Sequence, residues 1–297
     1  MSDTTRAAVL VTSKQLAAEI ADTQEDLVIL DVRWELPTGT GEKVDGHADY
    51  LAGHIPGAVY VDLDAQLAAP PAPGEGRHPL PPIDDLEVAA RSWGIHKDSR
   101  VVVYDDISGQ GAARAWWLLR YGGLTDVRIL DGGFEEWEIS GHPVDSDEVT
   151  VMPGDVTLTP GHMPVLTADQ ALEWAARGDL LDARGGVRYR GEFEPIDVKA
   201  GHIPGARSAP TGHNLTRDGL FRPAEDLTVR FAAHDVRPGE PVGVYCGSGV
   251  TAAHQIAALA SIGIEAALYV PSWSGWVGDD NHPVETGPDP WRQAAAA

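Results

Sequence analysis

The stretch PVGVYCGSGVTAAHQIAALA, residues 241–260, contains the features that decide the fold. Its segment VGVY, at 242–245, is a short apolar run that is typical of a buried parallel strand. A glycine-rich turn follows, and GVTAAHQIAALASIG at 249–263 predicts a helix that ends at a glycine. Strand, turn and helix in this order indicate an α/β domain with a central parallel sheet.

A second feature of the sequence is a long internal repeat. The hexapeptide GHIPGA occurs at 53–58 and again at 201–206. A buried-strand pattern ending in Asp-x-Arg precedes each copy, LVILDVR at 27–33 and DLLDAR at 179–184. The separation between matching segments shrinks steadily along the chain, as shorter loops in the second copy would produce. The chain is therefore predicted to be a tandem duplication.

The repeat sets the expected domain organisation. We predict one domain at 8–142, a Pro/Gly/Asp-rich linker at 143–163 and a second domain at 164–288. Each copy begins with Thr-x-x-Gln before an apolar helical period, at Thr12 and Thr167, which predicts a capping box. The fold class is α/β, with two tandem domains that each have a central parallel sheet flanked by helices.

Composition limits the possible partners. The 297 residues carry a formal net charge of −23, which disfavours nucleic acid and anionic membranes because both are bound through an excess of Lys and Arg. No apolar stretch approaches a membrane span, and the N-terminal sequence lacks an apolar signal core. A single cysteine gives no internal disulfide. We expect a cytoplasmic protein and a monomer.

The single cysteine, Cys246, is the first residue after the strand VGVY. Ligands of open parallel sheets bind at the carboxyl ends of the strands. The glycines that follow allow a tight turn whose N–H groups, together with the helix dipole, favour a thiolate. The alternative is a small buried hydrophobe, which most free cysteines are. The first copy has Asp105 at the matching position, which is typical of one active and one inactive half.

These features together resemble the rhodanese superfamily: tandem domains, GHIPGA, a cysteine in the second domain and Asp105 in the first. The resemblance extends over about residues 8–286. It implies that Cys246 is the nucleophile that forms a persulfide. It also implies that the donor's charge is held by the loop residues Gly247, Ser248, Gly249, Val250 and Thr251. The sequence CGSGVT is similar to that of 3-mercaptopyruvate sulfurtransferases, whereas thiosulfate-preferring members tend to carry basic residues after the cysteine.

The same resemblance assigns donor-binding arginines. The segment VRYRGEFEP is similar to the family's substrate-arginine segment, and Arg188 matches its first arginine. Family members often carry a second arginine nine residues further on, where this chain has Asp197. Arg190 or Lys199 could compensate for that difference.

Members that use mercaptopyruvate also place a Ser-His-Asp set near the cysteine, and the matching residues here are Ser248, His78 and Asp64. Pyruvate leaves as an enolate that must be protonated, and a hydroxyl-histidine-carboxylate relay can supply that proton. The alternative for His78 is a solvent-exposed histidine in the Pro-rich segment RHPLP.

Other sites receive less support. His54 and His202, one in each GHIPGA copy, are interpreted as structural because one of them lies in the half without a cysteine. The histidines show no spacing typical of a metal site, and no phosphate-binding glycine motif occurs, so we expect neither a metal nor an organic cofactor. A cysteine phosphatase would need an arginine at position 252, which is Ala252. A GxSxG hydrolase would need glycine where Cys246 stands.

The sequence thus predicts a sulfurtransferase that moves sulfur from 3-mercaptopyruvate through a Cys246 persulfide. The expected acceptor is a thiol, a thioredoxin-like dithiol or cyanide. Two alternatives stay open: a thiosulfate:cyanide sulfurtransferase with the same nucleophile, and a non-catalytic sulfur-carrier or interaction protein on the same scaffold.

Overall fold

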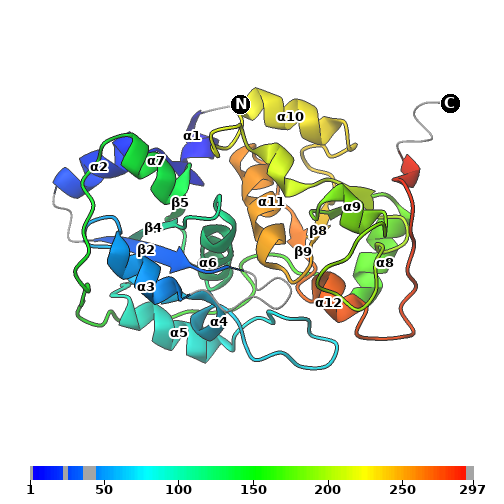
Figure 1. The fold of residues 1–297 in the computed structure, drawn as a ribbon, viewed down its shortest axis with the longest axis horizontal. Coiled ribbons are helices and arrows are strands. Elements are labelled where there is room, and N and C mark those ends of the chain that lie inside the picture. The colour runs from blue at the N-terminus through cyan, green and yellow to red at the C-terminus, as the bar shows by residue number, and fades with distance from the viewer. Residues whose placement is uncertain (1–2, 23–25, 36–44, 292–297) are drawn as a thin grey trace.

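The computed structural model describes residues 3–22, 26–35 and 45–291, which form two all-parallel sheets side by side (Figure 1). In the first sheet the strand order is β1-β5-β4-β2-β3. Its strands are β1 (Leu10–Val11), β2 (Leu27–Arg33), β3 (Val59–Asp62), β4 (Arg100–Tyr104) and β5 (Val127–Leu130). The central strands β2 and β4 are buried, in keeping with their continuous apolar sequence.

The second sheet repeats this order with shorter strands. It runs β7-β6-β8-β9, and Val165 forms a parallel bridge to Leu268 of β9, at the place where β1 pairs with β5 in the first sheet. Its strands are β6 (Leu180–Asp182), β7 (Arg207–Ser208), β8 (Gly243–Tyr245) and β9 (Ala267–Leu268). The predicted fold class, two tandem α/β domains with parallel sheets, is confirmed.

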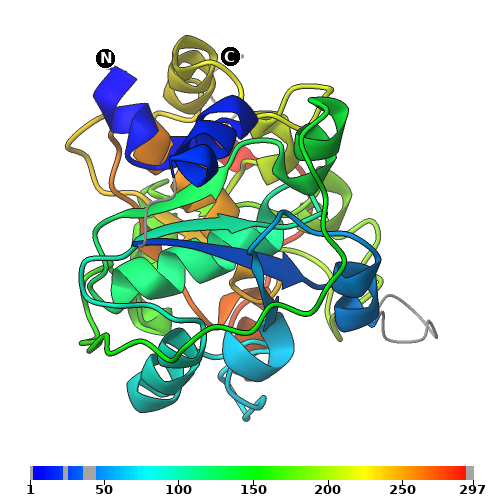
Figure 2. The same ribbon diagram turned by 90° about the vertical axis from the view of Figure 1, so that its left-hand side faces the viewer.

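Helices flank both sheets, and Figure 2 shows the strands of the first sheet between helices above and below them. The helices of the first half are α1 (Asp3–Ala7), α2 (Ser13–Ala21), α3 (Gly46–Ala52), α4 (Leu63–Gln66), α5 (Ile83–Ser92), α6 (Gln110–Tyr121) and α7 (Gly133–Ile139). Those of the second are α8 (Ala168–Ala176), α9 (Gly186–Tyr189), a 3₁₀ turn (Thr211–Asn214), α10 (Ala224–Ala232), α11 (Val250–Ser261) and α12 (Ser272–Trp276).

Local predictions hold at the helix starts. Thr12 and Thr167 cap α2 and α8, and each forms the expected capping box with a glutamine three residues on. Between α7 and α8 the chain contains no further helix or strand, which is where the linker at 143–163 is predicted. The exact limits of the two domains stay a prediction.

The two GHIPGA segments form matching corners. His54 Nδ1 lies 2.9 Å from the Tyr50 carbonyl, and His202 Nδ1 lies 2.8 Å from that of Tyr189. Each imidazole is fully buried and stacks on the ring of the tyrosine whose carbonyl it contacts. The ring centroids are 4.0 Å apart for His54 and Tyr50 and 3.7 Å apart for His202 and Tyr189. The shared geometry in both halves supports a structural role for these histidines.

The domains are joined by helix packing. The long helices α6 and α11, each of which follows a central strand, lie against each other at the centre of the molecule (Figure 1). One continuous apolar core includes residues of both helices and both sheets. The domain interface therefore brings the segment after β3 of the first domain to the loop after β8 of the second.

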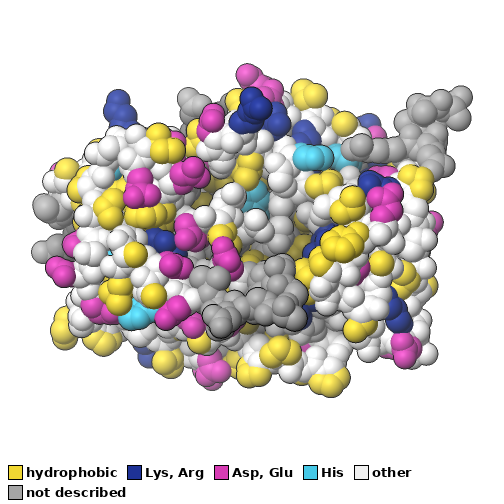
Figure 3. Space-filling model, in the orientation of Figure 1, with side chains coloured by type: hydrophobic (Ala, Val, Ile, Leu, Met, Phe, Trp, Pro, Cys, Tyr) yellow, Lys and Arg dark blue, Asp and Glu magenta, His cyan; other side chains and the backbone are white. Residues whose placement is uncertain are grey.

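The surface reflects the composition. Figure 3 shows acidic side chains dispersed over one face, with fewer Lys and Arg. Within the described residues, no helix is long and apolar enough to cross a membrane.

Candidate active site

Cys246 lies at the carboxyl end of β8, where a central strand gives way to α11. Its backbone is fixed on both sides: its N–H donates to Ser272 Oγ at 3.2 Å, and its carbonyl accepts from Trp273 N at 2.9 Å. The Gly249 N–H donates to Cys246 Sγ at 3.2 Å. The loop therefore directs a hydrogen-bond donor at the sulfur, as the sequence predicts.

Two residues of this loop region adopt left-handed backbone conformations. Gly249, at φ 85°, begins α11, and a Cβ there would lie 2.9 Å from the Val270 carbonyl oxygen. Glycine is required at this turn for both reasons. Ser272 has φ 52°, a strained value for a non-glycine residue, and its hydroxyl receives the Cys246 N–H. Sequence patterns alone do not indicate this role of Ser272.

A pocket of about 320 Å³ opens beside the cysteine. Its walls include four predicted loop residues, Gly247, Ser248, Val250 and Thr251. The other lining residues come from both domains: Trp34, Arg77, Ala183, Arg184, Gly185, Arg188, Pro210, Thr211, Gly212 and His213. Cys246 itself is only 1% exposed, and the two residues that follow it, Gly247 and Ser248, line the pocket.

Ser248, His78 and Asp64 meet at the domain interface. His78 Nδ1 lies 2.7 Å from Ser248 Oγ, and His78 Nε2 lies 3.4 Å from Asp64 Oδ1. Trp34 holds the acid by donating its indole N–H to Asp64 Oδ1 at 2.9 Å, and its ring packs edge-on against His78. The structure therefore assembles the three residues in the predicted order, with His78 buried rather than exposed in its loop.

The protonation of His78 follows from its surroundings. Burial lowers the pKa of His78, while the Asp64 carboxylate opposes this shift, so the imidazole is neutral at neutral pH. Asp64 as a carboxylate can only accept, which assigns the proton to Nε2. Nδ1 then accepts from the Ser248 hydroxyl, and the serine proton points at the histidine.

Arg114 of α6 holds the segment that contains His78 through hydrogen bonds to its backbone. Its guanidinium is fully buried and donates to the carbonyls of Leu67, His78 and Pro79. Burial lowers the pKa of Arg114 to about 10, and the charge of the neighbouring Cys246 opposes that shift. Arg114 therefore remains a cation near the sulfur and positions His78. No local sequence pattern marks an arginine in an apolar helix as a site residue, so Arg114 is not predictable from the sequence alone.

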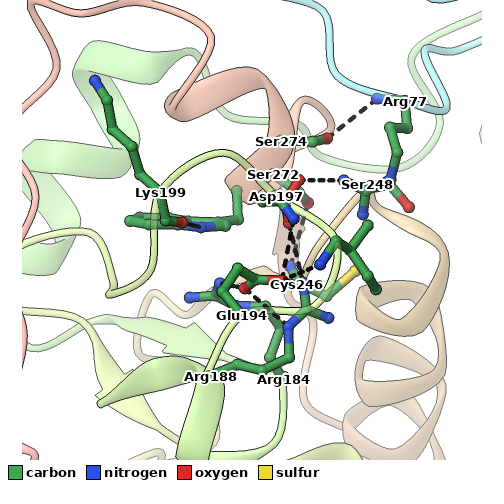
Figure 4. A network of polar contacts seen from close by, with 12 residues as sticks. Arg77, Arg184, Arg188, Glu194, Asp197, Lys199, Cys246, Ser248, Ser272 and Ser274 are labelled. Atoms are coloured by element: carbon green, nitrogen blue, oxygen red, sulfur yellow. Dashed lines mark hydrogen bonds and ion pairs between the residues drawn. The ribbon is translucent and has the colours of Figure 1, made fainter. Parts of the chain in front are cut away.

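The predicted donor arginine, Arg188, lines the pocket but already has partners. It donates to Glu194 at 2.7 and 2.9 Å and to Asp197 Oδ2 at 2.9 Å (Figure 4). Arg184 also lines the pocket and pairs with Asp182 at 2.6 Å. The pocket is therefore lined with arginines whose charges are balanced by carboxylates.

The structure does not bring Arg190 or Lys199 to the pocket. Arg190 pairs with Glu192, two residues away, at 2.7 Å, and Lys199 pairs with Asp280 at 2.7 Å. Both side chains are more than a third exposed and neither lines the pocket. The local acid Glu192 competes for Arg190, which explains why the sequence expectation does not match this geometry.

Sequence comparisons place the chain among known proteins. The model of the rhodanese-like domain matches twice, over residues 12–140 and 167–279. The chain belongs to the rhodanese family. A Mycobacterium tuberculosis relative named as a thiosulfate sulfurtransferase, SseB, is 45% identical over 287 residues, covering 95% of this chain and 98% of the relative. A Pseudomonas aeruginosa relative named as a 3-mercaptopyruvate sulfurtransferase is 44% identical over 289 residues, covering 94% and 99%.

A solved structure of the rhodanese family agrees. SseA from Escherichia coli, described as a 3-mercaptopyruvate sulfotransferase, superposes with a TM-score of 0.77 at 32% identity. The match covers 89% of this chain and 98% of SseA. Relatives named for thiosulfate and relatives named for 3-mercaptopyruvate thus both match this chain along almost its whole length.

Proposed function

We propose that this rhodanese-family protein transfers a sulfur atom from 3-mercaptopyruvate to a thiol, a thioredoxin-like dithiol or cyanide, through a persulfide on Cys246. That it is a sulfurtransferase follows from its family and relatives. The observation that carries the donor assignment is the contact of the Ser248-His78-Asp64 set with the cysteine loop. Such a relay serves a donor whose leaving group needs a proton.

The first step forms the persulfide. The Cys246 thiolate attacks the sulfur of 3-mercaptopyruvate, a sulfur–sulfur bond forms, and the carbon–sulfur bond breaks. The bonding pair stays on carbon as the enolate of pyruvate. As the sulfur–sulfur bond forms, the donor's thiol proton passes through the Ser248 hydroxyl to Nδ1 of neutral His78, and Asp64 stabilises the imidazolium at Nε2–H. The imidazolium then returns the proton through Ser248 to the enolate carbon, which gives pyruvate and neutral His78. The Gly249 N–H that donates to Sγ stabilises the negative sulfur.

The second step regenerates the free Cys246 thiolate. An acceptor thiolate or cyanide attacks the outer sulfur of the persulfide, and the Cys246 thiolate leaves. The protein needs neither a metal nor an organic cofactor in this scheme, because Cys246 itself carries the transferred group. A thiolate nucleophile must stay reduced between turnovers, which supports the proposed cytoplasmic location.

The charge of the pocket favours a monoanionic donor. Three arginines line it, namely Arg77, Arg184 and Arg188. Three carboxylates pair with them: Asp182, Glu194 and Asp197. A balanced pocket accommodates the single charge of mercaptopyruvate more readily than the two charges of thiosulfate, since each added charge is desolvated beside arginines that already pair with carboxylates.

The deciding experiment compares kcat/KM for 3-mercaptopyruvate and for thiosulfate, with cyanide as the common acceptor. We expect a clear preference for mercaptopyruvate; a preference for thiosulfate would make the protein a thiosulfate sulfurtransferase. Mass spectrometry after donor treatment should show one added sulfur on the Cys246 peptide. No turnover with either donor would instead favour the non-catalytic sulfur-carrier role.

A further inference from the structure

One of the three arginines that line the pocket, Arg77, comes from the first domain. Arg77 lies in the segment between α4 and α5 of the first domain, next to His78. A Cβ on Gly247 would lie 2.9 Å from Arg77 Nη2 and 3.6 Å from Arg188 Nη2. Two guanidinium groups, one from each domain, therefore converge over the residue that follows Cys246.

Arg77 is held in place by contacts to the cysteine loop and its surroundings. Its backbone N–H donates to Ser274 Oγ at 3.1 Å, and the Ser274 N–H donates to the Gly247 carbonyl at 2.9 Å (Figure 4). The Arg77 side chain is 27% exposed, so it is open to the pocket. Its buried Nε–H has no hydrogen-bond partner among the described residues, which leaves one donor unused.

Asp197 connects the two arginines. One of its carboxylate oxygens accepts from Arg77 Nη1 and the other accepts from Arg188 Nη2. The Asp197 side chain is 3% exposed, and burial raises its pKa. A carboxylate that bridges two guanidinium groups has the chemistry of the donor's own carboxylate, and it lies where the family's second arginine was expected.

We propose that Arg77 binds the donor's anionic group together with Arg188, and that this group competes with the carboxylate of Asp197 for the two guanidinium groups. The inference rests on the proposed function and adds the residue that takes the place of the missing second arginine. A bridging carboxylate also holds both cations in position while the site has no donor, at the cost of weaker donor binding. The donor class is a small molecule with one carboxylate or a comparable acidic group.

The test measures KM and kcat for 3-mercaptopyruvate, with cyanide as acceptor, in Arg77→Gln, Asp197→Asn and wild-type protein. Loss of a charge-assisted contact in Arg77→Gln should raise KM about tenfold or more, with kcat changed less than about threefold. Arg77→Lys should recover part of the loss. Asp197→Asn should lower KM by about threefold or more, because the competing charge is gone. The control is Arg177→Gln, an exposed arginine outside the pocket, and its KM should equal that of wild type.

Each outcome has a defined meaning. An unchanged KM in Arg77→Gln would overturn the assignment of Arg77, and an unchanged or higher KM in Asp197→Asn would overturn the competition. If Arg77→Gln lowers the unfolding midpoint, Asp197→Asn decides instead, because it leaves Arg77 in place, and an unchanged KM in that variant would count against the proposal. Failure of the proposed function is distinguishable, because wild-type protein treated with donor would then gain no sulfur on Cys246.

Discussion

The two domains carry the same loop at the end of a central strand and use it in different ways. In the first domain, Asp105 follows β4, and its carboxylate accepts N–H groups of Ile107, Gly109 and Ala112 at 3.1, 2.7 and 2.9 Å. In the second, Cys246 follows β8, and among the described residues its sulfur accepts only the Gly249 N–H. Both loops direct N–H groups from the start of a helix at the side chain that follows the strand. The first loop gives three N–H groups to its carboxylate, whereas the second gives one to its sulfur.

Each loop is also faced by a histidine from the opposite domain. His78 bonds to Ser248 in the second loop and has Asp64 behind it. The ring of His254, from α11, lies 3.4 Å from the position of a Cβ on Gly109 in the first loop. His254 has Thr211 and Phe221 as its neighbours, and its Nε2 has no partner among the described residues. Of these two histidines, His78 has both ring nitrogens paired, one with a hydroxyl and one with a carboxylate, whereas within the described part of the chain His254 has only Nδ1 paired.

The largest expected effect comes from removing the sulfur. Cys246→Ser should abolish turnover, since a serine hydroxyl at this loop is not a comparable nucleophile near neutral pH. Its free energy of unfolding should change by less than about 1 kcal/mol, because the change conserves shape. Steady-state assays and urea denaturation check both parts. Residual turnover close to wild type would remove Cys246 from the mechanism.

A second prediction separates the relay from the nucleophile. His78→Gln should lower kcat with 3-mercaptopyruvate by about 10²-fold, the usual scale of general acid–base catalysis. Turnover of thiosulfate should change little, because sulfite leaves as a stable anion that needs no proton on carbon. The two donors thus serve as internal controls for each other. Equal losses with both would indicate that His78 only supports the loop.

A third prediction concerns the loop that lacks the sulfur. Asp105→Ala leaves two buried N–H groups and one partly buried N–H group without this acceptor, which should lower the free energy of unfolding by about 3 kcal/mol or more. The kcat of the folded fraction should stay near the wild-type value. Asp106→Ala is the matched control: that carboxylate is partly exposed and pairs with Arg33 at 3.0 Å, so the cost should stay below about 1 kcal/mol. A large kcat loss in Asp105→Ala would mean that the first loop acts in catalysis.

Sequence and structure agree where the signal is local or repeated. GHIPGA, the strand runs and the lone Cys246 are each contained in a short segment, so the fold and the position of Cys246 could be predicted from them. Ser248, His78 and Asp64 could be chosen only through the resemblance to the family. Arg77 and Arg114 could not be predicted, because their roles depend on how α6 and α11 pack and no local pattern records that packing. Arg190 shows the opposite case: the sequence offered it as a donor-binding residue, but in the structure it pairs with its neighbour Glu192.

The smallest predicted effect tests whether the histidine at the first loop is purely structural. Burial lowers the pKa of His254 to about 4, below the 6.5 of a free histidine. The unfolded chain therefore takes up a proton that the folded protein does not, and stability falls as pH decreases from about 6.5 toward 4. Between pH 7 and pH 5 this residue should account for about 2 kcal/mol of lost stability. His254→Gln should remove that part of the slope in urea denaturation at the two pH values. His96→Gln, at an exposed histidine, should leave it unchanged. If His254→Gln and wild-type protein lose the same stability between pH 7 and pH 5, the buried neutral imidazole of His254 does not contribute to the pH dependence.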